Sequence, residues 1–414
     1  METPRLLSLP ISRCVNIGIV SFVLVSLLYG CASPKLVTET MPLSGDASAK
    51  KDIFVFLDGT GNNPGSETNV WKLYQLVDAS SKDQTTALYI AGVGSAEDAP
   101  LSEFALGRGM ESRILEAYSF ISDNYSTGDR VFLFGFSRGA HQARSLAGLV
   151  SYAGLLKKQG PEPGARVQDA NRVIELVKKQ RDQDFQTHWQ NWRTGQPPPL
   201  ANAIYEKLGL TVVPGEIAFL GVWDTVPGSS LKRYGVCKEE IGEIKKRGKF
   251  IPGIDYGERY KSATYPPINH IAHAVSIDEK RSKFRPLLIC PPIQTSTIVD
   301  EVWFPGAHAD VGGGYEDSDA LPLISLGWMR DLLAQYYPNV GKPTSQGNPH
   351  GLAHWSIGDK PANFGSECED RHPPSNSVHD SFHKRKEKPA VLVSWYGKKI
   401  SMPYPISCNQ DSHR

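Results

Sequence analysis

An excess of charge of either sign is missing from this 414-residue chain, in which 45 basic and 44 acidic residues leave a formal net charge of +1. Nucleic-acid-binding proteins usually carry a basic excess. That class of partner is therefore not expected, and we interpret the short basic run at 383–386 as solvated surface. Cysteines are few, six in all, and no two of them have the CxxC spacing, which argues against a zinc or redox site. Internal repeats and low-complexity tracts are absent as well, so the composition is that of an ordinary globular protein.

The N-terminal apolar stretch, residues 15–30, is shorter than the roughly 20 residues that span a bilayer comfortably. It follows two arginines and stops at Cys31. These flanks are typical of a secretory signal, and the end of the stretch resembles a bacterial lipobox. We therefore predict a lipoprotein signal peptide over 1–30, lipidation of Cys31 and a polar tether over 31–50. An uncleaved membrane anchor and a plain signal peptide are the alternatives.

Cleavage before Cys31 would remove two arginines and one glutamate and leave no net charge. A neutral protein gains little from anionic headgroups, so acyl chains would have to hold it at the membrane. Ala32 and Ser33, rather than aspartate, follow the cysteine, and resemblance to Gram-negative lipoproteins then favours the outer membrane of the cell envelope. Disulfides can form in that oxidising compartment. Four more cysteines allow three pairings, and the sequence does not choose between them: Cys237, Cys290, Cys368 and Cys408.

Strand and helix patterns alternate along the rest of the chain. Apolar runs bounded by turn residues predict buried strands at 52–59, 86–92, 130–135, 216–226 and 300–308. Between them, apolar residues at helical spacing predict helices, for example from Val70 to Val77, at 110–125 and at 319–337. This alternation predicts an α/β fold, namely a doubly wound, mostly parallel sheet with helices on both faces.

One domain over 51–400 is expected to hold this sheet, followed by a tail over 401–414. Two stretches interrupt the alternation, at about 155–215 and 227–297, and we interpret both as insertions. The second is rich in Gly, Pro, Lys and Tyr and is predicted to lie over the end of the sheet where ligands bind. Residues 390–400 are predicted to form a final edge strand.

The strand at 130–135 runs into the sequence Gly-Phe-Ser-Arg-Gly at 135–139, and a helix pattern follows. Gly-x-Ser-x-Gly alone is a weak pattern, but a strand before it and an amphipathic helix after it are the context of a nucleophile elbow. Gly135 and Gly139 would let strand and helix cross closely. We therefore predict that Ser137 is a catalytic nucleophile.

A serine hydroxyl needs a histidine to take its proton and an acid to orient that histidine. In the chain order Ser, acid, His, Asp224 ends one later strand and His308 ends another. Ligands of doubly wound sheets bind at these strand ends, so we predict Asp224 and His308 as the partners of Ser137. Asp310 with His379 is the alternative pair.

The first strand ends in Asp58-Gly59-Thr60-Gly61. Backbone amides of Gly59 and Thr60 could join the amide of Arg138 in an oxyanion hole. A phosphatase with an Asp-Gly-Thr signature is disfavoured, because its nucleophile position holds Phe56. A divalent metal at the acidic residues after His308 is also disfavoured, because their spacing matches no standard loop. No metal and no cofactor is therefore predicted.

Five blocks in this order resemble the α/β-hydrolase domain of the type VI secretion phospholipase effector family, over about residues 52–330: FLDGTGNNP, GFSRGAHQAR, FLGVWDTV, HAVSIDEKRSKFRP and WFPGAHADVGGGY. The resemblance implies an α/β-hydrolase fold and a serine phospholipase or related esterase, with Ser137 at the family's nucleophile and Asp224 and His308 in its other active-site blocks.

The expected function is hydrolysis of carboxylic esters of lipids by a lipid-anchored envelope enzyme, with phospholipid or another lipid ester as its partner. The alternative is a catalytically silent lipoprotein that uses the fold for binding or scaffolding. If the insertion at 227–297 is a lid, its apolar residues would form a wall for acyl chains: Tyr234, Phe250, Ile251, Tyr256 and Tyr260.

Overall fold

The structure is a computed structural model of the chain. It describes residues 36–43, 49–80, 84–95, 109–157, 163–179, 186–227, 264–358 and 366–413. The predicted signal peptide and Cys31 lie outside the described residues, and so do the five residues predicted to form a wall for acyl chains. From Leu36 onward the chain forms one compact unit.

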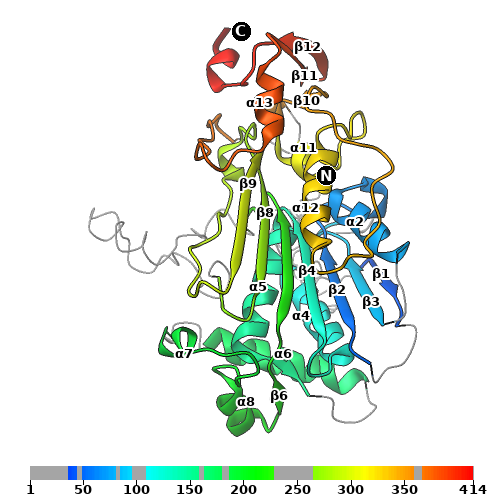
Figure 1. Cartoon of the computed structure of the whole chain (residues 1–414), viewed down its shortest axis with the longest axis vertical. Helices are drawn as coiled ribbons and strands as arrows, with labels where there is room; N and C mark the ends of the chain where they lie inside the picture. Colours follow the sequence, from blue (N-terminus) through cyan, green and yellow to red (C-terminus); the bar gives the residue numbers. More distant parts are fainter. Residues whose placement is uncertain are drawn as a thin grey trace, which may run out of the picture. The chain divides into compact units, whose positions relative to one another are not determined.

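A seven-stranded sheet forms the centre of this unit (Figure 1). In spatial order its strands are β1 (Thr38–Met41), β3 (Thr85–Ile90), β2 (Asp52–Leu57), β4 (Arg130–Phe136), β7 (Ile217–Trp223), β8 (His270–Ser276) and β9 (Ile298–Phe304). Every neighbouring pair is parallel except β1 and β3, which are antiparallel. The predicted mostly parallel sheet is thus confirmed.

Helices cover both faces of the sheet, which explains why its strands are almost continuously apolar. On β2, Ile53, Val55 and Leu57 point to one face and Phe54 and Phe56 to the other. The aliphatic face packs against α4 (Met110–Asn124) and α5 (Arg138–Ala153), and α6 (Pro163–Lys179) packs on these two helices. The aromatic face packs against α2 (Asn69–Asp78) and α12 (Pro322–Leu333). Because successive side chains of a strand point to opposite faces of the sheet, the strands contribute to two separate hydrophobic cores.

Three segments differ from the sequence prediction. The interval 227–297 contains β8, a central strand, so it is not simply an insertion. Two histidines interrupt the apolar pattern of β8, so the sequence did not predict this strand. In the structure His270 binds Asp300 and His273 binds Glu301, so both polar side chains have hydrogen-bond partners inside a buried strand. The predicted tether contributes β1, and residues 390–400 do not extend the main sheet.

A small separate sheet forms instead near the C-terminus, from β10 (Ala353–His354), β11 (Val391–Trp395) and β12 (Lys398–Met402). Trp355 and Trp395 stack in its own core. α13 (Asp380–Lys386) lies near it (Figure 1). The disulfide Cys368–Cys408 joins the chain before α13 to the chain after β12. This C-terminal part is folded, so the predicted tail belongs to the domain.

The other interval predicted to be an insertion, 155–215, holds a two-stranded sheet and helices: β5 (Leu155–Leu156), β6 (Val212–Val213), α6, α7 (Gln186–Gln190) and α8 (Ala201–Leu208). Within the described ranges, none of the helices has both the length and the apolar character needed to cross a bilayer.

Candidate active site

The carboxyl ends of the parallel strands carry the residues that the sequence singled out. Asp58 follows β2, Ser137 follows β4, Asp224 follows β7, and His308 lies shortly after β9 at the start of α11 (His308–Gly312). Parallel strands all deliver their carboxyl ends to one edge of the sheet, where ligands of this fold class bind.

Ser137 lies at the sharp turn between β4 and α5. Its backbone has φ 57° and ψ −124°, a combination that a residue with a side chain adopts only under strain. Its amide donates to the Trp223 carbonyl at 3.0 Å, and its carbonyl accepts from Val226 at 3.2 Å. These bonds brace the turn against the chain on either side of Asp224. The geometry is that of a nucleophile elbow.

Two glycines make this turn possible, as predicted. A Cβ added at Gly139 would lie 2.1 Å from the Leu57 carbonyl oxygen, and one at Gly135 would lie 2.5 Å from the Gly139 carbonyl oxygen. Both distances are far inside van der Waals contact, so any side chain would push α5 away from β2 and β4. The prediction of a close strand–helix crossing is confirmed.

Asp224 and His308 are joined directly. The Nδ1 atom of His308 lies 2.6 Å from Oδ2 of Asp224, and the carboxylate is fully buried. The imidazole packs against the rings of Phe136 and Phe284, with ring centroids 4.6 Å and 5.1 Å away. With Nδ1 held by the carboxylate, Nε2 is the ring nitrogen left to accept a proton, which is the arrangement a general base requires.

Electrostatics set the protonation states of this pair. Burial disfavours the charged Asp224, but Arg371 and His308 outweigh it and hold the pKa of Asp224 well below its usual range. Burial lowers the pKa of His308, opposed by the hydrogen bond that its Nδ1 donates to Asp224. The carboxylate is therefore ionised and the imidazole neutral near pH 7, as the acid and base of a serine hydrolase need to be.

The loop after β2 approaches Ser137 closely. A Cβ at Gly59 would lie 3.3 Å from the Cβ of Ser137. The Gly59 amide, however, donates to Oδ1 of Asp58 at 2.7 Å. Gly59 is thus not placed as the predicted oxyanion donor in this structure, and the amides of Thr60 and Arg138 remain predictions. The Thr60 hydroxyl is buried and has no hydrogen-bond partner within the part of the chain that is described.

Asp58 itself is a site residue that the sequence analysis did not single out. It accepts from Thr68 and Tyr89, both at 2.7 Å, as well as from Gly59. Burial raises its pKa to about 6 despite these donors. The carboxylate ties the loop next to Ser137 to β3 and to the start of α2.

In the alternative pair, Asp310 and His379 each bind other residues. Asp310 binds Nδ1 of His354 at 2.7 Å and the His354 amide at 2.9 Å. His379 instead caps α13, where Nδ1 accepts from the Ser381 amide, and its ring stacks on Phe304. The sequence could not foresee this, because His354 comes from β10, a strand too short to leave a pattern.

Two of the acidic residues after His308 that were considered as metal ligands also bind other side chains. Asp317 binds Nε2 of His354 at 2.8 Å, and Asp319 binds Lys72 at 2.7 Å. Within the described ranges no group of three or more metal-binding side chains converges.

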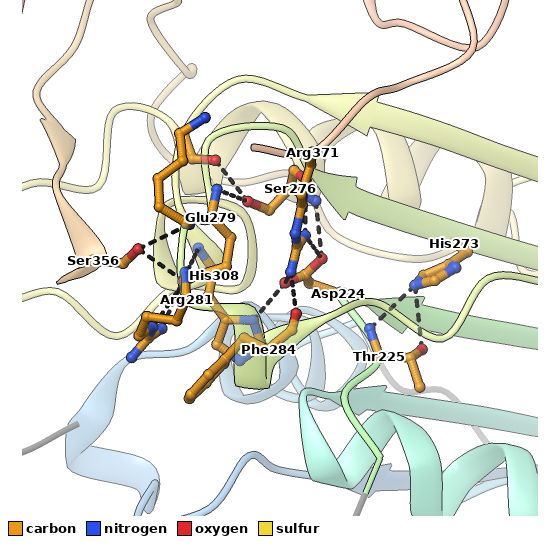
Figure 2. A network of polar contacts seen from close by, with 12 residues as sticks. Asp224, Thr225, His273, Ser276, Glu279, Arg281, Phe284, His308, Ser356 and Arg371 are labelled. Atoms are coloured by element: carbon orange, nitrogen blue, oxygen red, sulfur yellow. Dashed lines mark hydrogen bonds and ion pairs between the residues drawn. The ribbon is translucent and has the colours of Figure 1, made fainter. Parts of the chain in front are cut away.

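Two further charged residues meet the Asp224–His308 pair (Figure 2). Glu279 accepts from the His308 amide at 3.2 Å and from Arg281, and Arg371 binds both oxygens of Asp224. Glu279 lies in the block HAVSIDEKRSKFRP, so the sequence marked its neighbourhood without a role. Arg371 lies in a loop without any pattern, and no signal in the sequence could have found it.

Comparison with known proteins gives a family match over most of the domain. The model of the family described as "T6SS, Phospholipase effector Tle1-like, catalytic domain" matches residues 51–331. A curated relative, the uncharacterized protein YEL023C of Saccharomyces cerevisiae, is 26% identical over 267 residues, which cover 60% of this chain and 34% of the relative. The chain thus spans about a third of the length of the curated relative it matches.

Two solved structures are also similar. An uncharacterized protein from Pseudomonas aeruginosa matches with a TM-score of 0.35 and 17% identity, covering 70% of this chain and 46% of that chain. The propionate-bound esterase Est2 of Thermogutta terrifontis matches with a TM-score of 0.37 and 12% identity, covering 76% and 92%.

Proposed function

Because the chain belongs to the T6SS phospholipase effector Tle1-like catalytic domain family, we propose that it is a serine hydrolase that cleaves carboxylic ester bonds of lipids. The proposal is carried by two features found together at the carboxyl ends of the strands: the buried hydrogen bond between His308 and Asp224, and a serine in a strained strand-to-helix turn. Each of these features is costly to build and is needed for activating a serine.

In the proposed reaction, the Ser137 hydroxyl attacks the ester carbonyl while Nε2 of His308 takes its proton. Asp224 stabilises the imidazolium that forms, and the amide of Arg138, at the N-terminus of α5, donates to the developing oxyanion. His308 then returns the proton to the leaving alcohol, and an acyl group remains on Ser137. Water repeats the sequence and releases the fatty acid.

The cell envelope is the proposed place of action, with the protein held there by acyl chains on Cys31. The disulfide Cys368–Cys408 supports this, since disulfides persist in oxidising compartments. Injected effectors do not normally carry a lipoprotein signal, so we propose a resident enzyme and no effector role. Replacing Cys31 with serine would abolish acylation and release the protein from membrane fractions, whereas wild-type protein without acyl label would contradict the anchor.

The test of the activity is hydrolysis by the full chain in mixed micelles of phospholipid and detergent, beside its Ser137→Ala variant. Released fatty acid is measured by mass spectrometry, and a fluorophosphonate probe reports the nucleophile. We expect wild-type protein to release fatty acid and to be labelled, and the variant to do neither. Wild-type protein that is folded, unlabelled and inactive on lipids and short esters would favour the silent scaffold instead.

A further inference from the structure

The carboxylate of Asp224 has a second charged partner besides His308. Nη1 of Arg371 donates to Oδ1 at 2.6 Å, and Nη2 donates to Oδ2 at 3.2 Å. The Arg371 side chain is 7% exposed and the Asp224 side chain is completely buried. Oδ2 is thus shared between the guanidinium and the imidazole (Figure 2).

The guanidinium of Arg371 is fixed by more than this ion pair. Nη1 also donates to the Ser276 carbonyl at 2.8 Å, and Nη2 donates to the Phe284 carbonyl. Ser276 also donates its amide to Oδ1 of Asp224 at 3.0 Å. The planar fork of an arginine is suited to this geometry, and the shorter, pointlike ammonium of a lysine is not.

The segment that carries Arg371 is tied to the chain around Glu279. The Glu369 amide donates to the Lys280 carbonyl at 2.9 Å, and Asp370 forms an ion pair with the buried Lys280 at 2.9 Å. Cys368, three residues before Arg371, is bonded to Cys408. Arg371 thus reaches the site from a braced segment that lies beyond residues 51–331, the part that matches the family model.

The position of Arg371 has an electrostatic consequence for the base. An ionised carboxylate raises the pKa of a neighbouring histidine, and a cation on the same carboxylate weakens that effect. Asp224, Glu279 and Arg281 face His308 directly, and Arg281 lowers its pKa whereas the two carboxylates raise it. Arg371 acts through Asp224, so that this carboxylate can orient His308 without holding it protonated. Without Arg371, Asp224 would bind the imidazolium more strongly, and the pKa of His308 would rise.

We propose that Arg371 is a positioning residue for the active site, which fixes the Asp224 carboxylate and keeps His308 unprotonated at neutral pH. This inference rests on the proposed function for its kinetic consequences, although the effect on His308 itself does not depend on turnover. The C-terminal segment thereby completes a site whose other members lie within the family-matched residues.

The experiment compares Arg371→Met, Arg371→Lys and Arg285→Met in the full chain. Arg285 is the matched control, because it lines the same surface cavity of about 260 Å³ as Arg371 but pairs with Glu369 and is 74% exposed. Ester hydrolysis is followed from acid to alkaline pH, and the ring signals of His308 are titrated by NMR, assigned with His308→Gln. Thermal unfolding checks that each variant is folded.

For Arg371→Met we expect kcat/KM near neutral pH to fall by about tenfold or more, because the acidic limb of the profile and the His308 titration both move up by about one pH unit. Arg371→Lys keeps the charge, so its acidic limb should stay near that of the wild type while kcat falls through lost orientation. Arg285→Met should match the wild type in both measurements. Added methylguanidine, which could enter through the cavity, should restore part of the activity of an Arg371→Ala variant.

Several results would overturn the inference. One is a His308 titration unchanged in a folded Arg371→Met protein, and another is an equal shift in Arg285→Met. If Arg371→Met does not fold, Arg371→Lys decides, since unchanged kcat there would show that the bidentate geometry is unimportant. An inactive wild type would contradict the proposed function alone, because the NMR titration would still test the effect of Arg371 on His308.

Discussion

Single residues set the chemistry of this site through burial and a few short contacts. Ser137 is held in a strained turn, His308 is oriented by Asp224, and Asp58 binds the loop beside Ser137. Each of these side chains is almost completely buried, so charges and protons act there with little screening by water. The consequences can be tested one residue at a time.

Ser137 and His308 should behave as one functional unit. We expect Ser137→Ala and His308→Ala each to lower kcat by about 10^3-fold or more, and the double variant to be no worse than either, because each removes the same proton-transfer step. The measurement is ester hydrolysis at saturating substrate. His379→Ala is the matched control, since His379 caps α13 away from Asp224, and a dead His379→Ala beside an active His308→Ala would contradict the assignment.

Asp58 should give stability a specific pH dependence. Burial raises its pKa in the folded state from 3.8 to about 6, so the folded chain binds this proton more tightly than the unfolded chain. The resulting stabilisation is complete below about pH 3.8 and is lost as the pH rises through about 6. The loss corresponds to about 3 kcal/mol.

The Asp58→Asn variant isolates this contribution. The free energy of unfolding is measured with denaturant at several pH values. Between about pH 4 and pH 8 the wild type should lose about 3 kcal/mol of stability that the variant does not lose. Parallel pH curves for the two proteins would show that the proton on Asp58 does not distinguish the folded from the unfolded state.

At the scale of the elements, strands and helices decide where these residues meet. The elbow exists because α5 crosses β2 and β4 at a distance that only glycine allows. β8 separates β7 from β9, so Asp224 and His308 come from strands that are not neighbours. Their hydrogen bond therefore depends on the chain after β9, which turns back through Gly306 with φ 105° before α11 begins.

Glycine substitutions should separate the elbow from ordinary helix positions. Gly139→Ala should destabilise the protein by about 3 kcal/mol or more, because its methyl group would lie 2.1 Å from the Leu57 carbonyl oxygen. Gly327→Ala in α12 meets nothing within 4 Å and should stabilise by about 0.5–1 kcal/mol through helix propensity. Denaturant unfolding measures both, and equal effects would contradict the close crossing.

At the scale of the whole molecule, the C-terminal part of the chain contacts residues of the candidate site. The segment around Cys368 and the small sheet β10–β12 lie after the family-matched residues, yet they supply Arg371 to Asp224 and His354 to Asp310. The disulfide Cys368–Cys408 closes a loop with a sequence separation of 40 residues. Stability of this part and activity of the site should therefore be linked.

Removal of this disulfide tests the link. The double variant Cys368→Ser/Cys408→Ser should lose about 3–4 kcal/mol of stability, from the entropy of the opened loop, and its acidic limb should shift in the direction expected for Arg371→Met. Substitution is preferable to a reductant because Cys290 is also disulfide-bonded. Lower stability with an unchanged pH profile would show that the other contacts of the segment suffice to place Arg371.

The sequence by itself determined most of the sheet and pointed to three candidate site residues, Ser137, Asp224 and His308. Buried parallel strands are almost uniformly apolar, so β2, β4 and β7 stand out in a single sequence, and Gly-Phe-Ser-Arg-Gly marks the turn that follows β4. Asp224 and His308 could be singled out because strand ends in this fold class collect ligands. These signals are local, since each depends on a few adjacent residues and on the periodicity of one element.

Only the tertiary structure decided which charges face one another. β8 was hidden because His270 and His273 are satisfied by Asp300 and Glu301, which come from another strand. Arg371 lies 147 positions from Asp224 in the chain, and His354 lies 44 from Asp310. A polar side chain gives no periodic signal of its own, and its partner is fixed by the free energy of burying both groups together. That free energy depends on the whole fold, and therefore no short stretch of sequence encodes it.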